Sequence, residues 1–314
     1  MKIRVLALFL LIAGALALSA CGGGEASTTA SPATVVAGSP AATATAPFPV
    51  TIKDDKGVEV TINSAPARVV ALAPSFVEVL FALGAGGSVV AADENTDYPP
   101  EAASIPKISG FQPSLEGIAG YNPDLVLLLF DPGGLQDALR QAGFNTLYLA
   151  SPASIDDTFK QIETIGAALG RGVAAQGLIG QMQASLAGIK GRIPQGAAGP
   201  RVYHEVDNTF YTAGPGSFVD DLYSTLGAKN IAESTGEPFP QLSAEAIISA
   251  DPEVIILADE FAGESRDTVA ARPGWSQISA VKNGRVFTID PNIVSRPGPR
   301  LIDALETLAK LLYP

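Results

Sequence analysis

Two glutamates occupy equivalent places in two stretches of this chain that match each other without a gap. Residues 114–129 align with residues 243–258, and the alignment places Glu116 opposite Glu245. Each stretch begins with a serine, which is a good helix N-cap, and a carboxylate in the first turn interacts favourably with the helix dipole. Each glutamate is therefore expected at the start of a short helix. There it could serve the helix alone, or it could form ion pairs with a basic partner.

The residue types that most often carry catalysis or bind metals are scarce. His204 is the only histidine and Cys21 the only cysteine, so neither a histidine pair nor a Cys/His pair is available for a zinc or iron site. A Ser-His-Asp triad would have to use His204, and the chain contains no Gly-x-Ser-x-Gly motif. The sequence therefore predicts a protein that is not an enzyme and has no intrinsic cofactor or metal ion.

The elements around the two glutamates follow from the same repeat. Asn122-Pro123 and Asp251-Pro252 are expected to stop the helices, because the residue before a proline is disfavoured in the helical region. The apolar runs Leu125–Phe130 and Val254–Leu257 are typical of strands buried on both faces of a parallel sheet. Strands and helices alternate along most of the folded chain, which indicates α/β architecture. The self-similarity predicts two lobes built on one plan.

The folded part divides into three predicted segments. Residues 50–153 and 193–314 are predicted to be the N-terminal and C-terminal α/β lobes. Residues 154–192 show no strand pattern and carry apolar residues at helical spacing, so they are predicted to be the helix that joins the lobes. Glycines weaken a single helix by roughly 1 kcal/mol each relative to alanine, which leaves two helices in series as the alternative. The glycines concerned are Gly170, Gly172, Gly177 and Gly180.

The N-terminus has the features of a secretory signal. Lys2 and Arg4 precede the apolar run Val5–Ala17, which is too short for a comfortable membrane span. The next residues, Leu18-Ser-Ala-Cys21, resemble the bacterial lipobox, in which the cysteine becomes the lipidated first residue of the mature protein. Residues 1–20 are therefore predicted to be a lipoprotein signal peptide, and the alternative is a plain signal with an incidental cysteine.

Residues 21–49 are predicted to be a flexible tether after the lipidated Cys21. They are mostly glycine, serine, threonine, alanine and proline with one charge, Glu25, and such a composition cannot bury a core. Loss of Lys2 and Arg4 with the signal would change the net charge from −12 to −14. Such a charge argues against nucleic acid as a partner. The protein is expected to cross the cytoplasmic membrane and remain lipid-anchored on its outer face, in a periplasm or on an open cell surface.

Several short motifs along residues 50–314 occur in a characteristic order. They are Asp54-Asp-Lys-Gly57, Ala67-Arg-Val-Val-Ala-Leu-Ala-Pro-Ser75, Glu78-Val-Leu-Phe-Ala-Leu-Gly84, Asp97-Tyr-Pro-Pro100, Leu115-Glu116, Asn122-Pro-Asp-Leu-Val126, Pro240-Gln-Leu-Ser-Ala-Glu245 and Pro297-Gly-Pro-Arg300. In this order the chain resembles the helical-backbone class of ABC-importer binding proteins, which capture vitamin B12, ferric siderophores and haem. The resemblance implies two similar α/β lobes joined by one long helix, with the ligand in the cleft between the lobes.

The resemblance also implies a role for the paired glutamates. Glu116 and Glu245 match the family's docking glutamates, which engage arginines of the two permease subunits of an ABC importer with its ATPase. With one such glutamate on each lobe, a pseudo-twofold binding protein would meet a twofold permease. The binding protein itself is expected to be a monomer. The alternative is that both residues are only first-turn acids that interact with a helix dipole.

For the cleft, the resemblance implies an aromatic lining. Phe111, Phe130 and Phe239 fall at positions where the corrinoid binder has tryptophans, and Asn95 falls at the position of its cleft tyrosine. Aromatic faces suit a large planar metal chelate, although each phenylalanine could instead be a core residue. Further candidates near the expected cleft are Tyr98, His204, Tyr211, Trp275 and Arg296. An arginine would suit an anionic siderophore, and haem binders of the class use a tyrosine or a histidine as the iron ligand.

The predicted function is that of a lipid-anchored binding protein that delivers a metal chelate to an ABC importer. A corrinoid and a ferric siderophore are nearly equal candidates for the ligand, and haem is third. Two alternatives come from other classes of protein. One is an extracellular α/β hydrolase, and the other is a sensing or adhesion module that keeps the fold without a transporter.

Overall fold

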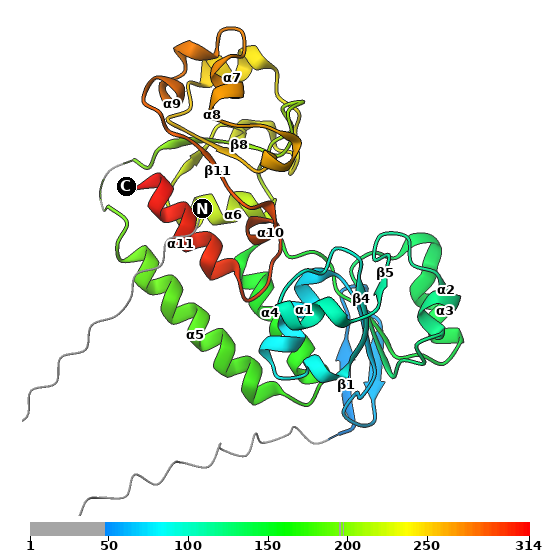
Figure 1. The fold of residues 1–314 in the computed structure, drawn as a ribbon. Coiled ribbons are helices and arrows are strands. Elements are labelled where there is room, and N and C mark those ends of the chain that lie inside the picture. The colour runs from blue at the N-terminus through cyan, green and yellow to red at the C-terminus, as the bar shows by residue number, and fades with distance from the viewer. Residues whose placement is uncertain (1–47, 195, 197) are drawn as a thin grey trace, which may run out of the picture. The chain divides into compact units, whose positions relative to one another are not determined.

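The computed structural model describes residues 48–194, 196 and 198–314 (Figure 1). The predicted signal peptide, the lipidation at Cys21 and nearly all of the predicted tether lie outside the described residues and stay predictions. Within the described part of the chain, no helix is both long and apolar enough to cross a membrane.

The N-terminal half is built on a parallel five-stranded sheet in the order β5-β4-β3-β6-β7. The strands are β3 (Val69–Leu72), β4 (Val89–Asp93), β5 (Lys107–Ile108), β6 (Leu125–Leu128) and β7 (Thr146–Tyr148). Every residue of β3 and β6 is buried, as expected for strands in the interior of a parallel sheet covered on both faces. The prediction of a buried strand in the apolar run Leu125–Phe130 is thereby confirmed.

Side chains of β3 alternate between two clusters of helices. Val69 and Ala71 pack with α1 (Pro74–Ala82), whereas Val70 and Leu72 pack with α2 (Leu115–Ala119) and α3 (Leu135–Gln141). An antiparallel hairpin of β1 (Val50–Lys53) and β2 (Glu59–Ile62) precedes the sheet. At its turn, buried Asp54 accepts hydrogen bonds from the backbone of Val58 at 2.9 Å and of Tyr148 at 3.3 Å, and so ties the hairpin to β7.

The C-terminal half repeats this plan with one strand fewer. Its parallel sheet has the order β9-β8-β10-β11, with β8 (Arg201–Glu205), β9 (Lys229–Asn230), β10 (Val254–Leu257) and β11 (Val286–Thr288). One face packs on α6 (Phe218–Thr225) and α11 (Leu301–Leu312), and the other on α7 (Ala244–Ala250), α8 (Arg266–Ala270) and α9 (Ser279–Lys282). A short helix, α10 (Pro291–Val294), precedes α11. The order matches β4-β3-β6-β7, so the predicted pair of similar α/β lobes is confirmed.

The internal repeat has the local geometry that its sequence predicts. The Ser114 hydroxyl accepts a hydrogen bond from the Gly117 N–H, and the Ser243 hydroxyl accepts one from the Ala246 N–H, each at 3.1 Å. These serines are the N-caps of α2 and α7. After each helix the residue before proline takes a left-handed conformation, with φ of 45° at Asn122 and 46° at Asp251. The repeat therefore reproduces one cap–helix–strand unit in both halves.

The connecting segment consists of two helices, α4 (Ile155–Ala168) and the longer α5 (Gly172–Lys190), so of the two alternatives for residues 154–192 the structure has two helices in series and not one continuous helix. Gly170 has a φ of 66°, and the Arg171 N–H bonds back to the Gly166 carbonyl at 2.7 Å. This is the left-handed glycine stop that ends many helices. Helix α5 continues through the remaining glycines over 19 residues, or about 28 Å at 1.5 Å per residue.

The last part of the chain returns to the N-terminal half. Arg300 donates two hydrogen bonds to the Glu78 carboxylate of α1, at 2.6 and 3.0 Å. A Cβ on Gly298 would lie 3.7 Å from the Ser75 side chain, so this residue approaches α1 closely. The Pro297-Gly-Pro-Arg300 motif thus holds the C-terminal segment against α1.

Candidate ligand-binding site

Most of the predicted cleft residues lie on loops that follow the carboxyl ends of the parallel strands. In the N-terminal half Asn95 follows β4, Phe111 follows β5 and Phe130 follows β6. In the C-terminal half Tyr211 follows β8 and Phe239 follows β9, and Tyr211 forms a bridge with Gln241. In open α/β sheets, ligands bind outside the carboxyl ends of the strands. The fold therefore brings these residues to the edges at which a ligand is expected.

Phe111 and Phe130 form an exposed aromatic pair. Their ring centroids are 5.5 Å apart at an interplanar angle of 76°, an edge-to-face contact. Phe111 is 66% exposed and Phe130 is 45% exposed. The alternative that they are core residues is therefore wrong, and large apolar side chains grouped at a surface indicate a binding site.

The C-terminal half also exposes aromatic side chains. Phe239 is 60% exposed and Tyr211 is 41% exposed, so neither is a core residue. A further exposed aromatic, Phe261, was not among the predicted site residues. The internal repeat could have identified it, because Leu257 matches Leu128 and the loop after β10 therefore corresponds to the loop after β6.

Buried Asp93 connects the two loops that carry Asn95 and Phe111. One carboxylate oxygen accepts the Asn95 N–H at 2.8 Å, and the other accepts the Gly110 N–H at 3.0 Å. A Cβ on Gly110 would lie 2.1 Å from the Asp93 carboxylate and 2.8 Å from the Leu72 carbonyl oxygen. One side chain therefore holds both loops, and no room is left at Gly110.

Gly110→Ala is expected to destabilise the protein by about 1–3 kcal/mol, because the added methyl overpacks a closed site. The same change should weaken ligand binding, since Asn95 and Phe111 would shift with their loops. Urea unfolding and a ligand titration measure the two effects. Gly87→Ala is the matched control, because a Cβ there meets nothing within 4 Å and should change neither quantity. Equal behaviour of the two variants would contradict this account of Asp93.

Asn95 and Arg296 line an open pocket of about 540 Å³, together with Pro74, Asn292 and the rest of residues 94–97. Arg296 donates a hydrogen bond to Asp97, donates to the Asn292 side chain at 2.7 Å, and lies 3.8 Å from Glu78. Burial would raise the pKa of Asp97, but the hydrogen bond and charge of Arg296 hold it below its usual value. Arg296 is therefore already paired and offers little uncompensated charge to an anionic ligand, and its role in the cleft stays a prediction.

Tyr98 lines a second pocket, of about 490 Å³, with Phe81 and Pro299. Its ring lies under the Arg300 guanidinium, at 4.3 Å from the ring centroid, and the side chain is 42% exposed. The structure thus leaves Tyr98 accessible but does not place it in the lining of the pocket of Asn95 and Arg296.

Two of the predicted cleft residues belong to the core. His204 is 2% exposed, its Nδ1 lies 2.7 Å from the Tyr223 hydroxyl, and burial lowers its pKa to about 4. Trp275 is 1% exposed and packs between the rings of Tyr203 and Phe210. Both predictions are wrong, because the side chains point into the packed interior and not toward a ligand.

A buried charged cluster at the carboxyl edge of the second sheet escaped the sequence analysis. Arg272 donates to both oxygens of Glu205 at 2.6 Å and to Glu264 at 2.8 Å. Asp259 is fully buried and neither of its carboxylate oxygens has a hydrogen bond. Burial, together with the charge of Glu205, raises the pKa of Asp259 to about 7.

Within the described ranges, no three His, Cys, Asp or Glu side chains are arranged to hold a metal ion.

Glu116 and Glu245 are both exposed in the first turns of their helices. Among the described residues, neither carboxylate forms an ion pair or a hydrogen bond with a neighbour. Ser114 and Ser243 already cap the two helices. Because the serines cap the helices, the carboxylates of Glu116 and Glu245 remain available to bind a partner.

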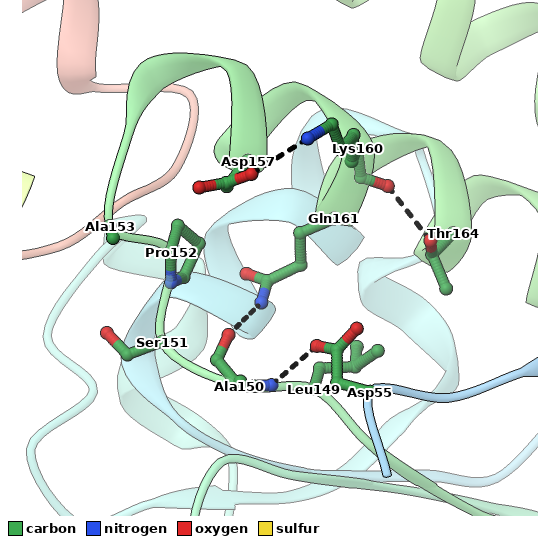
Figure 2. Close-up of a pocket in the computed structure, with 10 residues that line it drawn as sticks. All are labelled: Asp55, Leu149, Ala150, Ser151, Pro152, Ala153, Asp157, Lys160, Gln161 and Thr164. Carbon is green, nitrogen blue, oxygen red and sulfur yellow. Dashed lines mark hydrogen bonds and ion pairs between the residues drawn. The ribbon is translucent and has the colours of Figure 1, made fainter. Parts of the chain in front are cut away.

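Another hollow, of about 260 Å³, lies beside α4 (Figure 2). The Ala150 N–H donates to Asp55 at 2.7 Å, and the Gln161 amide donates to the Ala150 carbonyl at 2.9 Å. Lys160 pairs with Asp157 at 2.9 Å. Because these polar groups satisfy one another, the hollow lacks the convergent unpaired groups that mark a ligand site.

Two matched parallel sheets with exposed aromatic side chains at their carboxyl edges define a two-lobed α/β binding protein. The family model described as "Periplasmic binding protein" matches residues 69–293. The chain belongs to this family, and the family predicted from the motifs is confirmed.

Named relatives agree with the assignment. The chain is 36% identical over 276 residues to the uncharacterised ABC transporter substrate-binding lipoprotein YvrC of Bacillus subtilis, a match that covers 85% of this chain and 86% of YvrC. It is 32% identical over 279 residues to the cobalamin-binding protein of Halobacterium salinarum, covering 85% and 74%. Among solved structures, the periplasmic haem-binding protein RhuT of Roseiflexus sp. RS-1 superposes with a TM-score of 0.72 at 29% identity, covering 80% and 98%.

Proposed function

We propose that this protein is the substrate-binding component of an ABC importer and that it captures a corrinoid outside the cytoplasmic membrane. The observation that carries the proposal is the set of exposed phenylalanines at the carboxyl edges of both sheets, Phe111, Phe130 and Phe239. Two relatives support it by their names, one as an ABC transporter substrate-binding lipoprotein and the other as a cobalamin-binding protein.

Exposed phenyl rings suit a ligand with a large apolar face. Each aromatic side chain that a ligand covers contributes roughly 25 cal/mol per Å² of apolar surface removed from water. Rings can also stack on or edge against a planar macrocycle. The edge-to-face pair of Phe111 and Phe130 already presents such a surface on the N-terminal half.

The charges around Asn95 favour a neutral, amide-rich ligand over an anionic one. Glu94 and Asp97 line the same pocket, and the one arginine of its lining is paired with Asp97. A carboxylate or catecholate ligand would meet repulsion there, whereas peripheral carboxamides can donate to the acids and bond with Asn95 and Asn292. This favours a corrinoid over an anionic ferric siderophore.

Haem is the second candidate. His204 cannot serve as its iron ligand in this conformation, because the ring is buried and its Nδ1 is bonded to Tyr223. The exposed tyrosines Tyr98 and Tyr211 are the side chains that could supply a phenolate ligand. The haem-binding protein RhuT has the same fold, which is the reason to test haem directly.

The proposal includes the predicted location and partners. Cys21 would carry the lipid anchor and residues 21–49 would tether the folded part to the outer face of the membrane, as the name of YvrC supports. Glu116 and Glu245 would dock on a permease dimer with its ATPase, and the protein would work as a monomer with a small-molecule cargo.

Calorimetric titration of residues 43–314, a compact unit, tests the ligand. We expect one cyanocobalamin per chain with Kd below about 1 µM, equivalent to about −8 kcal/mol. Because binding would bury apolar surface, the heat capacity change should be negative. Haemin and a ferric hydroxamate are the parallel titrations. Tighter binding of either one, with no heat from cyanocobalamin at several temperatures, would reject the corrinoid assignment.

A further inference from the structure

Phe261 is the most exposed large apolar side chain of the described residues, at 81%. It lies in the short 3₁₀ turn Glu260–Ala262, directly after the carboxyl end of β10. The turn ends at Gly263, whose φ of 89° is in the left-handed region, and the chain then enters α8. A phenyl ring held in water at a ligand-binding edge requires an explanation.

The loop that carries Phe261 is anchored on both sides of the ring. On one side, Asp259 is fully buried, and its carbonyl accepts the Ala262 N–H at 2.8 Å. On the other side, Glu264 accepts hydrogen bonds from Arg272 at 2.8 Å and from the Thr268 hydroxyl at 2.8 Å. The polar neighbours are thus fixed while the apolar ring faces solvent. Such preorganisation lowers the entropy lost when a side chain binds a ligand.

The position of Phe261 corresponds to that of Phe130 in the other half. Strand β10 occupies the same place in its sheet as β6 in the other. In the C-terminal sheet β10 lies between β8 and β11, and in the N-terminal sheet β6 lies between β3 and β7. Phe130 lies two residues after the end of β6, and Phe261 lies four residues after the end of β10. Both halves therefore present a phenylalanine from the loop that leads out of the equivalent strand.

We propose that Phe261 is a specificity-determining contact for the ligand and the counterpart of Phe130 in the C-terminal half. It would cover apolar surface of a bound corrinoid that the N-terminal pair of Phe111 and Phe130 does not reach. This inference rests on the proposed function. Glu264 and Arg272 are positioning residues in this account, since they hold the loop without touching the ligand.

Phe261→Ala tests the contact in the compact unit that contains both halves. We expect its Kd for cyanocobalamin to rise about tenfold or more, while the urea unfolding midpoint stays unchanged because the ring is exposed. Phe261→Trp should keep the Kd within about threefold of the unsubstituted protein. The matched control is Val173→Ala, which removes a 56% exposed apolar side chain from α5 and should not change Kd.

The outcomes separate this inference from the proposed function. If the unsubstituted protein binds cyanocobalamin, Phe130→Ala weakens binding and Phe261→Ala does not, the inference is wrong and the proposed function stands. If Phe261→Ala loses uptake but keeps the Kd, the ring contacts the permease and the inference is again wrong. Absence of any cyanocobalamin binding by the unsubstituted protein would overturn both.

Discussion

Changing Glu116 and Glu245 together to lysine is expected to abolish corrinoid uptake and to leave the Kd for cyanocobalamin unchanged. Both carboxylates are exposed, and one lies on each of the two matched halves. If they meet arginines of a permease dimer, a lysine in each place juxtaposes like charges, which costs several kcal/mol at an interface. Either single reversal should therefore reduce uptake by about tenfold or more, and the double reversal should reduce it below detection.

A matched control separates docking from the change in net charge. Glu163→Lys with Glu233→Lys changes the charge by the same amount at two other exposed glutamates, one on α4 and one in the 3₁₀ turn Glu233–Thr235. This pair should transport as the unsubstituted protein does. Uptake by whole cells and calorimetric Kd are the two readouts. Normal uptake by the Glu116 and Glu245 double variant would contradict docking and would favour a sensing module instead.

The parts of the fold that the sequence predicted are those set by local signals. The apolar runs that became β6 and β10 have the composition of buried parallel strands, and the serine caps and Asx-Pro stops set the ends of α2 and α7. Each of these signals acts within a few residues, so it needs no knowledge of the rest of the chain. Their recurrence in the same order predicted the two-lobed architecture.

Long-range packing decided what the sequence could not predict. Four glycines were equal candidates to interrupt the connecting segment. Only Gly170 has the left-handed φ that ends α4, and nearby Gly166 lies where a Cβ would be 2.4 Å from the Ala175 side chain. Likewise, Arg296 resembled a free ligand-binding cation until its partner Asp97, 199 residues away, was known.

The exposed and buried aromatics illustrate the same limit. Trp275 and Phe261 both follow β10 within one connection of the sheet, yet one is 1% and the other 81% exposed. Sequence spacing could not distinguish them, because neither lies in a long periodic helix or strand. The packing of Trp275 against Tyr203 and Phe210 depends on the assembled sheet, and the loop that carries Phe261 is bonded through Glu264 to Arg272, a contact that the sequence did not predict.

Glu78→Ala is expected to lower the free energy of unfolding by about 3–5 kcal/mol, the range for breaking a buried ion pair by removing one partner. The Glu78 side chain is 1% exposed and that of Arg300 is 14% exposed, so the stranded guanidinium would stay largely away from water. The hydrogen bond to Glu78 raises the pKa of Arg300. A guanidinium stays protonated in proteins even without such a partner, so the charge of Arg300 remains after the substitution. Urea unfolding measures the loss.

Replacing both partners distinguishes a packing defect from an unpaired charge. Glu78→Leu with Arg300→Met keeps similar side-chain volume and removes both charges of the pair, while Arg296 keeps its partner Asp97, so the double variant should recover most of the stability that Glu78→Ala loses. Because the pair joins α1 to the C-terminal segment, the single variant should also bind cyanocobalamin more weakly. The pocket of Asn95 and Arg296 is lined from both parts of the chain, and it would lose one of the contacts that hold these parts together. Glu163→Ala, at an exposed position on α4, is the control. A loss below about 1 kcal/mol for Glu78→Ala would show that the pair does not hold the two halves together.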